Sequence, residues 1–389
     1  MNARQVMKRL KAPLSLLVLG VLLALSGADA QSAAVRFAVI GDYGFAGQPE
    51  ADVATLVKSW NPDFIITVGD NNYPSGATST IDDNIGQYYH DFIAPYLGLW
   101  GPGATSNRFF SSLGNHDWAT AGAQPYLDYF SLPNNERYYD ILWGPVHLFA
   151  IDSDPNEPDG VTSSSIQAGW LQSELAASTA CWKLVSMHHP PYSSGATHGS
   201  STWMQWPYQA WGATAVLAGH DHEYERIVQG GFPYFVNGLG GKSIYAFGTP
   251  VSGSQVRYNG DYGAMLVDAS EASITFQFIS RTGTLIDTYT STSSNCVLAA
   301  PTNLTSKAVS SSRIDLTWTD NASNENGFLI EQSLNGATFA QIGQVGANVR
   351  TYSATGLSAS TTYYHRVRAY NGAENSAYSN TARTRTKRR

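Results

Sequence analysis

Short apolar runs alternate with amphipathic segments over the first two thirds of the chain. Val35–Ile40 and Phe64–Val68 are runs rich in β-branched and aromatic residues, which is typical of buried strands. Between them, Glu50–Trp60 places apolar side chains three and four positions apart, as on one face of an amphipathic helix. A strand, a helix and a second strand in this order predict a parallel strand pair with a right-handed crossover.

Further apolar runs of strand length follow, with a helical segment around Trp170–Leu175. These runs are Phe109–Leu113, Val146–Ile151, Trp182–Met187 and Ala215–Ala218. Beyond Ala218, glycine-rich segments of strand character continue to about Tyr289 without helical periodicity. Early β-α-β units followed by strand-rich segments predict an α/β domain with two mixed sheets and helices outside.

The pattern changes near Cys296, where a Ser/Thr-rich segment of short strands begins. Arg313–Trp318 and Tyr364–Ala369 alternate in polarity, as strands of a β-sandwich do. We expect Trp318 in the core of this sandwich and Tyr363 in a tyrosine corner. The segment resembles a fibronectin type III domain, an all-β immunoglobulin-like sandwich, over essentially its whole length. We assign residues 298–389, including a short basic tail, to this domain.

The N-terminal segment has the pattern of a secretory signal peptide. Four basic residues from Arg4 to Lys11 precede the apolar run Leu14–Leu25, and Ala28-Asp29-Ala30 provides small residues for cleavage. The apolar run is too short for a membrane span, and no later stretch approaches one. We expect residues 1–30 to be removed near Ala30-Gln31 and the mature protein to be secreted, extracellular or periplasmic. An uncleaved anchor is the alternative.

Charge is unevenly distributed over the chain, whose net charge is −7. Residues 31–300 hold 9 Lys and Arg against 24 Asp and Glu, a net charge of −15, whereas residues 301–389 hold 10 against 5. An acidic larger domain argues against a nucleic-acid-binding surface, which needs basic patches. It does not exclude a phosphate substrate, because bound cations would dominate the local charge. Cys181 and Cys296 either form a disulfide, which export permits, or remain separate.

Five of the segments described above end in residues that are typical of a metal site. The ends are Gly41-Asp42-Tyr43-Gly44, Gly69-Asp70-Asn71-Asn72-Tyr73, Gly114-Asn115-His116-Asp117, His188-His189-Pro190 and Gly219-His220-Asp221-His222. Each one alone is ordinary turn chemistry. Because α/β proteins bind ligands at the carboxyl ends of their strands, the five together predict one site assembled from several loops.

These strand ends supply more ligands than one metal ion can use. The candidates are two carboxylates, a phenol, an amide and three imidazoles: Asp42, Asp70, Tyr73, Asn115, His188, His220 and His222. Two adjacent metals with one bridging carboxylate account for them better. A set of carboxylates and a phenolate favours Fe(III), and the remaining set suits a divalent ion such as Zn, Fe or Mn. Such a pair forms a clamp for in-line displacement at phosphorus.

The ordered motifs resemble those of the metallophosphoesterase (calcineurin-like) superfamily, and within it the purple acid phosphatases. In this sequence they are Gly-Asp-x-Gly at Asp42, Gly-Asp-x-x-Tyr at Asp70, Gly-Asn-His-Asp at Asn115, Val-x-x-His at His188 and Gly-His-x-His at His220. The resemblance covers roughly residues 35 to 280 and implies a four-layer αββα sandwich. We therefore expect a metallophosphoesterase catalytic domain over residues 31–297.

The resemblance also implies a role for each motif residue. Asp42, Asp70, Tyr73 and His222 would hold the Fe(III), and Asp70, Asn115, His188 and His220 the divalent ion, with Asp70 bridging. His116 would donate to the substrate phosphate. His198, ten residues after His188, falls where the family often places another histidine that contacts phosphate or donates a proton. The surrounding loop matches the family poorly, so a solvated loop histidine is the alternative there.

The preferred hypothesis is an exported phosphatase that hydrolyses phosphomonoesters by attack of a metal-bound hydroxide. A phosphodiesterase or nucleotide pyrophosphatase with the same metals is the first alternative, because the motifs do not separate these reactions. The second is an inactive surface-binding protein, which the fibronectin-like domain suggests. That domain is expected to be a passive spacer or to contact a cell surface or a polymer.

Overall fold

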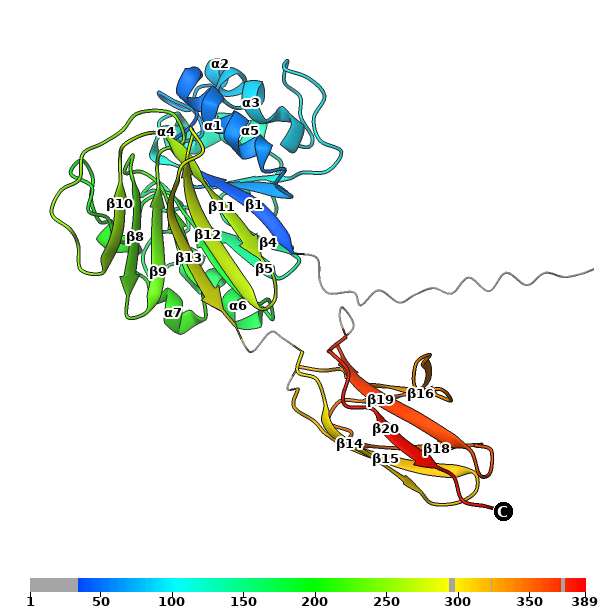
Figure 1. Cartoon of the computed structure of the whole chain (residues 1–389). Coiled ribbons are helices and arrows are strands. Elements are labelled where there is room, and N and C mark those ends of the chain that lie inside the picture. Colours follow the sequence, from blue (N-terminus) through cyan, green and yellow to red (C-terminus); the bar gives the residue numbers. More distant parts are fainter. Residues whose placement is uncertain (1–33, 294–297, 323, 372–374) are drawn as a thin grey trace, which may run out of the picture.

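The computed structural model describes residues 34–293, 298–322, 324–371 and 375–389 (Figure 1). The predicted signal peptide, its cleavage site and Cys296 lie outside these residues. Export and the pairing of Cys181 with Cys296 therefore stay predictions. Within the described ranges, no helix has both the length and the apolar character needed to cross a membrane.

The first sheet is mixed and has six strands. They are β1 (Val35–Ile40), β2 (Phe64–Thr67), β3 (Phe109–Ser111), β11 (Gly263–Ala269), β12 (Ser273–Ser280) and β13 (Leu285–Thr292). Their spatial order is β13-β12-β11-β1-β2-β3. Strands β1, β2 and β3 are parallel, and the three late strands extend the sheet in antiparallel fashion. Helix α1 (Gln48–Ser59) connects β1 to β2, which confirms the predicted β-α-β start.

The second sheet is also mixed and has seven strands. They are β4 (Tyr139–Trp143), β5 (Val146–Ala150), β6 (Trp182–Ser186), β7 (Ala215–Ala218), β8 (Tyr224–Gln229), β9 (Phe232–Asn237) and β10 (Ser254–Tyr258). Their order is β10-β8-β9-β7-β6-β5-β4. Strands β5, β6, β7 and β9 run parallel, whereas β4, β8 and β10 are antiparallel to their neighbours.

The two sheets face each other across a common apolar core, and helices cover their outer faces. One buried cluster joins residues of both sheets, including Phe37 and Ile65 of the first and Leu184 and Leu217 of the second. A second cluster packs the other face of the seven-stranded sheet against α6 (Ile166–Ala177) and α7 (Tyr208–Trp211). Figure 1 shows α1 and the neighbouring short helices beyond the first sheet and α6 and α7 beyond the second. This confirms the predicted αββα arrangement.

Short helical turns, rather than one long helix, form the tyrosine-rich segment after β2. This segment consists of α2 (Thr78–Ile81), the π-helix η1 (Asp82–Gly86), α3 (Gln87–Tyr89) and the 3₁₀ turn η2 (His90–Phe92). The remaining short helices are α4 (Asn115–Trp118), η3 (Ala121–Ala123), α5 (Gln124–Tyr129) and η4 (Thr202–Met204).

The C-terminal strands form a separate sandwich. Its sheets are β14 (Thr302–Ala308), β15 (Arg313–Thr319) and β18 (Thr351–Thr355), and β16 (Gly327–Ser333), β17 (Ala340–Gly346), β19 (Thr362–Tyr370) and β20 (Ala382–Arg385). Trp318 is buried against Phe328, as expected of the core tryptophan. The hydroxyl of Tyr363 accepts a hydrogen bond from the backbone N–H of Ser358 at 2.9 Å, which confirms the tyrosine corner.

Candidate metal centre

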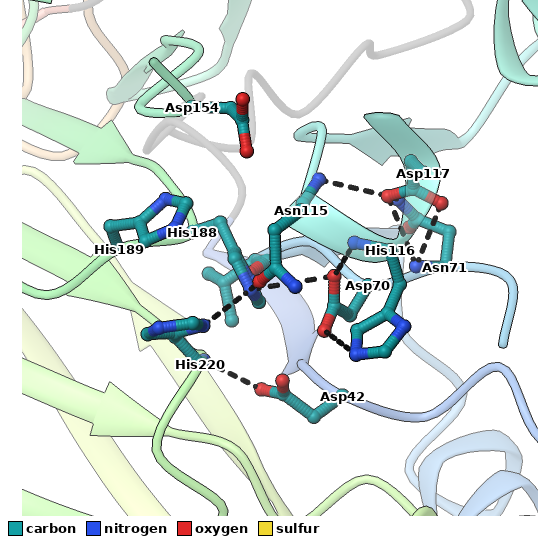
Figure 2. A network of polar contacts seen from close by, with 12 residues as sticks. Asp42, Asp70, Asn71, Asn115, His116, Asp117, Asp154, His188, His189 and His220 are labelled. Carbon is teal, nitrogen blue, oxygen red and sulfur yellow. Dashed lines mark hydrogen bonds and ion pairs between the residues drawn. The ribbon is translucent and has the colours of Figure 1, made fainter. Parts of the chain in front are cut away.

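Strands from both sheets direct their carboxyl ends to one place. The segments after β1, β2 and β3 carry Asp42, Asp70 and Asn115, while those after β6 and β7 carry His188 and His220. Figure 2 shows these five side chains converging. They converge because parallel strands expose the same end at one sheet edge, and the two sheets stack with those edges together.

The backbone is unusual where these side chains leave their strands. Asp42, Asp70 and His220 have φ values of 54°, 54° and 73°, in the left-handed region that residues with a Cβ seldom adopt. The Asp42 N–H donates to the Gly69 carbonyl at 3.1 Å, and the His220 N–H donates to the Asp42 carboxylate at 2.9 Å. Such strain is kept where the surroundings hold it in place and where it aims side chains at a site.

The phenol oxygen of Tyr73 lies at the middle of the first group of expected ligands. It is 2.8 Å from Asp70 Oδ2, 3.2 Å from Asp42 Oδ1 and 3.1 Å from His222 Nε2. His222 Nε2 is also 3.3 Å from Asp42 Oδ1. The four side chains are buried. They therefore form a compact set of three oxygen ligands and one nitrogen ligand.

The second group of expected ligands surrounds Nε2 of His188. This nitrogen is 3.0 Å from Asn115 Oδ1, 3.1 Å from His220 Nδ1 and 3.4 Å from Asp70 Oδ1. The other ring nitrogen, Nδ1, lies 2.9 Å from the Val68 carbonyl, an acceptor, so Nδ1 carries a hydrogen and Nε2 is the nitrogen that would ligate a metal ion after losing its proton. A histidine that ligates a metal is commonly oriented in this way.

Asp70 belongs to both groups through different oxygens. Its Oδ2 faces Tyr73 and its Oδ1 faces His188, and the side chain is almost fully buried. One carboxylate shared in this way is what a pair of adjacent metal ions requires. Asp42, Asp70 and His188 also offer ligand atoms that all lie within 4.8 Å of one another.

The electrostatics of the site favour a bound cation. Burial opposes protonation of His188, but the Asp70 and Asp42 carboxylates outweigh it and raise the pKa of His188 to about 10. Burial likewise opposes ionisation of Asp70, yet His188 and His116 hold the pKa of its carboxyl below the usual range. Burial, followed by Asp70 and Asp42, raises the pKa of the Tyr73 phenol. A metal ion supplies the positive charge that these lone pairs share, so the residues present fit a metal centre.

A buried polar network supports the loop that carries Asp70 and Tyr73. Asn71 receives hydrogen bonds at Oδ1 from Tyr43 and Thr67 and donates through Nδ2 to Asp117 and the Ser112 carbonyl. Asp117 also accepts from the Gly114 N–H at 2.8 Å. The network links the three strand ends of the first sheet, so Asn71 and Asp117 position ligands.

The two predicted substrate-contacting histidines lie beside different expected ligands. The His116 ring is 4.3 Å from that of Tyr73, and its Nε2 is 3.9 Å from Asp70 Oδ2. The His198 ring stacks on that of His220 at 4.0 Å. The structure thus brings both histidines next to expected ligands, including the one whose loop matches the family poorly. Their roles towards substrate stay predictions.

Several residues beside the ligands were not predicted from the sequence. Ser243 Oγ is 2.6 Å from Nδ1 of His222, and the Tyr245 ring stacks on that of His222 at 4.0 Å. On the other side, Ser153 Oγ is 3.0 Å from Nδ1 of His189, whose pKa is lowered to about 3 by burial and by neighbouring His188. These contacts join segments far apart in sequence, so no local sequence motif indicates them.

Two family models and several known proteins match this chain. The family model "Calcineurin-like phosphoesterase" matches residues 35–224, and "Fibronectin type III domain" matches residues 299–385. The chain is 27% identical over 259 residues to human tartrate-resistant acid phosphatase type 5, covering 58% of this chain and 79% of that protein. It is 28% identical over 281 residues to purple acid phosphatase 3 of Arabidopsis thaliana, covering 63% of this chain and 74% of the relative.

A solved structure supports the fold alone. The structure titled "GAP50 the anchor in the inner membrane complex of Plasmodium" superposes with a TM-score of 0.52 at 20% identity, covering 67% of this chain and 89% of that one. The acid phosphatases that match this chain imply a binuclear metal centre, and Asp42, Asp70 and His188 form a candidate metal-binding cluster in this chain.

Proposed function

We propose that this chain is an exported enzyme that hydrolyses phosphomonoesters. It carries a calcineurin-like phosphoesterase domain and is a phosphoric ester hydrolase related to the purple acid phosphatases. The observation that carries the proposal is the convergence of seven ligand side chains into two groups that share Asp70. No expected ligand position has lost its side chain or points away, which argues against an inactive binding protein.

Two ligand sets would hold the metals. Asp42, Asp70, Tyr73 and His222 would hold Fe(III), because three anionic oxygens suit a trivalent ion. The divalent ion, Zn, Fe or Mn, would be held by Asp70, Asn115, His188 and His220. When bound, the pair supplies Lewis acidity at the phosphoryl oxygens and lowers the pKa of an attacking water molecule.

Two histidines of the chain would orient the ester. His116 lies against the Tyr73 ring, its side chain is 36% exposed, and its Nδ1 is fixed 2.6 Å from the Pro74 carbonyl. With Nδ1 donating to that carbonyl, Nε2 would donate to a phosphoryl oxygen in the imidazolium form of the ring, which carries a hydrogen on both nitrogens. His198, stacked on His220 and near Tyr245, would donate a hydrogen bond or a proton on the other side.

Export and the role of the C-terminal domain complete the proposal. The signal-peptide pattern of residues 1–30 supports secretion after cleavage near Ala30-Gln31. The fibronectin type III domain would then act as a spacer, or as a contact to a cell surface or polymer. The acidic catalytic domain supports a small phosphate ester, rather than nucleic acid, as substrate.

Turnover of two model esters tests the reaction. We expect the purified protein to hydrolyse p-nitrophenyl phosphate faster than bis(p-nitrophenyl) phosphate. Asn115→Ala removes a ligand of one metal only and should lower kcat on the monoester by at least about 100-fold. Full turnover in that variant would contradict the proposed site, and faster cleavage of the diester would favour the phosphodiesterase alternative.

The visible absorption spectrum tests the metal and its phenolate ligand without a substrate. A tyrosinate bound to Fe(III) gives a charge-transfer band, which should be present in the wild type and absent in Tyr73→Phe. A colourless protein with two bound ions per chain would show a different metal pair.

A further inference from the structure

Lys242 lies beside the metal centre but has no place in the ligand sets. Its backbone N–H donates to the Asp42 carbonyl at 3.1 Å. Its ammonium lies 3.5 Å from the centroid of the Phe45 ring and 5.4 Å from that of the Tyr73 ring. Since Tyr73 is an expected ligand, this arrangement puts a positive charge next to the place where phosphate would bind.

The backbone before Lys242 is held against the end of β1. The Gly240 N–H donates to the Gly41 carbonyl at 2.9 Å, and a Cβ added to Gly240 would lie 2.4 Å from that same oxygen. A Cβ on Gly241 would lie 2.9 Å from Glu50 Cβ. Only glycines permit this approach. The main chain of Lys242 is therefore fixed relative to Asp42.

Lys242 differs from every other cationic side chain of the larger domain. Among the 9 Lys and Arg of residues 31–300, the other eight bind a carboxylate or a backbone carbonyl through their charged groups. Among the described residues, no oxygen atom binds the Lys242 ammonium, which contacts only aromatic ring faces. Lys242 is a partly buried residue, and an ammonium without an anionic partner has its charge available for a ligand.

We propose that Lys242 binds a phosphoryl oxygen of the substrate and favours dianionic phosphomonoesters over monoanionic phosphodiesters. The inference rests on the proposed function. A monoester carries nearly two negative charges above its second pKa of about 6, whereas a diester carries one. The same cation therefore attracts the monoester about twice as strongly. This attraction matters in a domain whose net charge of −15 repels anions.

Phe45 positions the ammonium without neutralising it. Its ring is 44% exposed and lies directly under the Lys242 ammonium. A cation–π contact restricts the flexible side chain while its charge stays unpaired. His116 contacts the same Tyr73 ring, at 4.3 Å, so an ammonium and an imidazole flank the expected phenolate ligand.

The test compares Lys242→Met, Lys242→Arg and Lys58→Met in the metal-loaded full chain. Methionine keeps the apolar contact with Phe45 but removes the charge, and arginine keeps the charge. Lys58 pairs with Asp91 in an exposed contact and serves as the matched control. We would measure kcat/KM for p-nitrophenyl phosphate and bis(p-nitrophenyl) phosphate at pH 8, metal content, and the dissociation constant of inorganic phosphate by calorimetry.

We expect Lys242→Met to lower kcat/KM on the monoester about 10- to 100-fold and on the diester several-fold less. Its dissociation constant for inorganic phosphate should rise about tenfold, with Lys242→Arg and Lys58→Met close to wild type. Three results for Lys242→Met would overturn the inference and leave the phosphatase proposal intact. These are an equal loss of kcat/KM on both esters, no loss on either, and a loss that added metal restores. If the wild type cleaves neither ester, the proposed function fails. If Lys242→Met binds inorganic phosphate as tightly as the wild type, the anion-binding role of Lys242 is refuted separately.

Discussion

At the scale of single residues, the contact between Ser243 and His222 fixes which imidazole nitrogen faces the expected metal. The hydroxyl lies 2.6 Å from Nδ1, so Nε2 is left to face Tyr73 and Asp42. We predict that Ser243→Ala lowers metal affinity about 10- to 100-fold, because outer hydrogen bonds orient ligands and set their basicity. A chelator competition titration measures it.

Ser243→Thr is the matched control for this prediction. It retains a hydroxyl at the same position, and its metal affinity should stay within a few-fold of wild type. Unchanged affinity in Ser243→Ala would mean that stacking on Tyr245 alone holds the ring.

His365 makes the C-terminal sandwich sensitive to acid. The residue is fully buried, its Nε2 lies 3.2 Å from Gln332 Oε1, and its Nδ1 has no hydrogen-bond partner among the described residues. Burial lowers the pKa of His365 to about 4, against about 6.5 in an unfolded chain. As the pH falls, His365 therefore becomes protonated in the unfolded state before it does so in the folded state. Its contribution to the free energy of unfolding is complete above pH 6.5 and is lost as the pH falls towards 4.

This titration alone should remove about 3 kcal/mol from the free energy of unfolding of the sandwich between pH 6.5 and 4. Denaturant unfolding at several pH values, followed by hydrogen exchange of peptides from the sandwich, measures it. His365→Gln cannot titrate and should unfold with a flatter pH dependence. Equal pH dependence in the two proteins would assign the acid sensitivity to other groups.

At the scale of elements, the loops after β1 and β2 touch backbone to backbone. The Tyr73 N–H donates to the Gly44 carbonyl at 2.8 Å, and a Cβ on Gly44 would lie 1.7 Å from the Asn71 carbonyl oxygen. We predict that Gly44→Ala costs about 3 kcal/mol of stability and weakens metal binding, because the two loops must separate. Thermal unfolding and metal titration measure the two effects.

Gly169 in α6 provides the comparison, since a Cβ there would meet no atom within 4 Å. Gly169→Ala should stabilise the protein by up to about 1 kcal/mol through helix propensity. If Gly44→Ala behaved like Gly169→Ala, the loops would have to be free to move apart.

Elements with a strong local pattern were predictable, and those held by distant contacts were not. The runs at β1 and β7 begin and end as their apolar residues indicate, because both strands are buried on two faces apart from the exposed Arg36 of β1. The turns from α2 to η2 lack such a pattern and depend on distant partners, such as the Asp82 carboxylate that binds Tyr96 and Tyr129.

The same distinction applies to the site. The expected ligands follow strand ends and carry local motifs, so the sequence could indicate that these side chains lie together. Lys242 and Ser243 reach the centre because Gly240 packs against Gly41 at the end of β1 and Gly241 packs against Glu50 of α1, contacts between residues about 200 positions apart. Residues without a motif become visible only once the chain is folded.

At the scale of the whole molecule, the described residues form separate cores. Two buried clusters draw on residues 35–278, and a third draws only on residues from Leu298 to Ala382. All expected metal ligands lie within residues 35–278, the part of the chain that forms the first two clusters. Since stability depends mainly on burial within each core, the two parts should unfold in separate cooperative steps.

We therefore predict two transitions in scanning calorimetry of the full chain, of which only the one from the catalytic domain responds to metal. Metal ions at 100 times their dissociation constant add about 2.7 kcal/mol to the free energy of unfolding. This raises the thermal unfolding midpoint of a domain of this size by about 5–10 °C. A chelator should reverse this shift. Ile314→Val, in the buried core of the sandwich, should instead lower the other midpoint by about 4–8 °C. A single transition that shifts in response to both changes would show that the two cores are coupled.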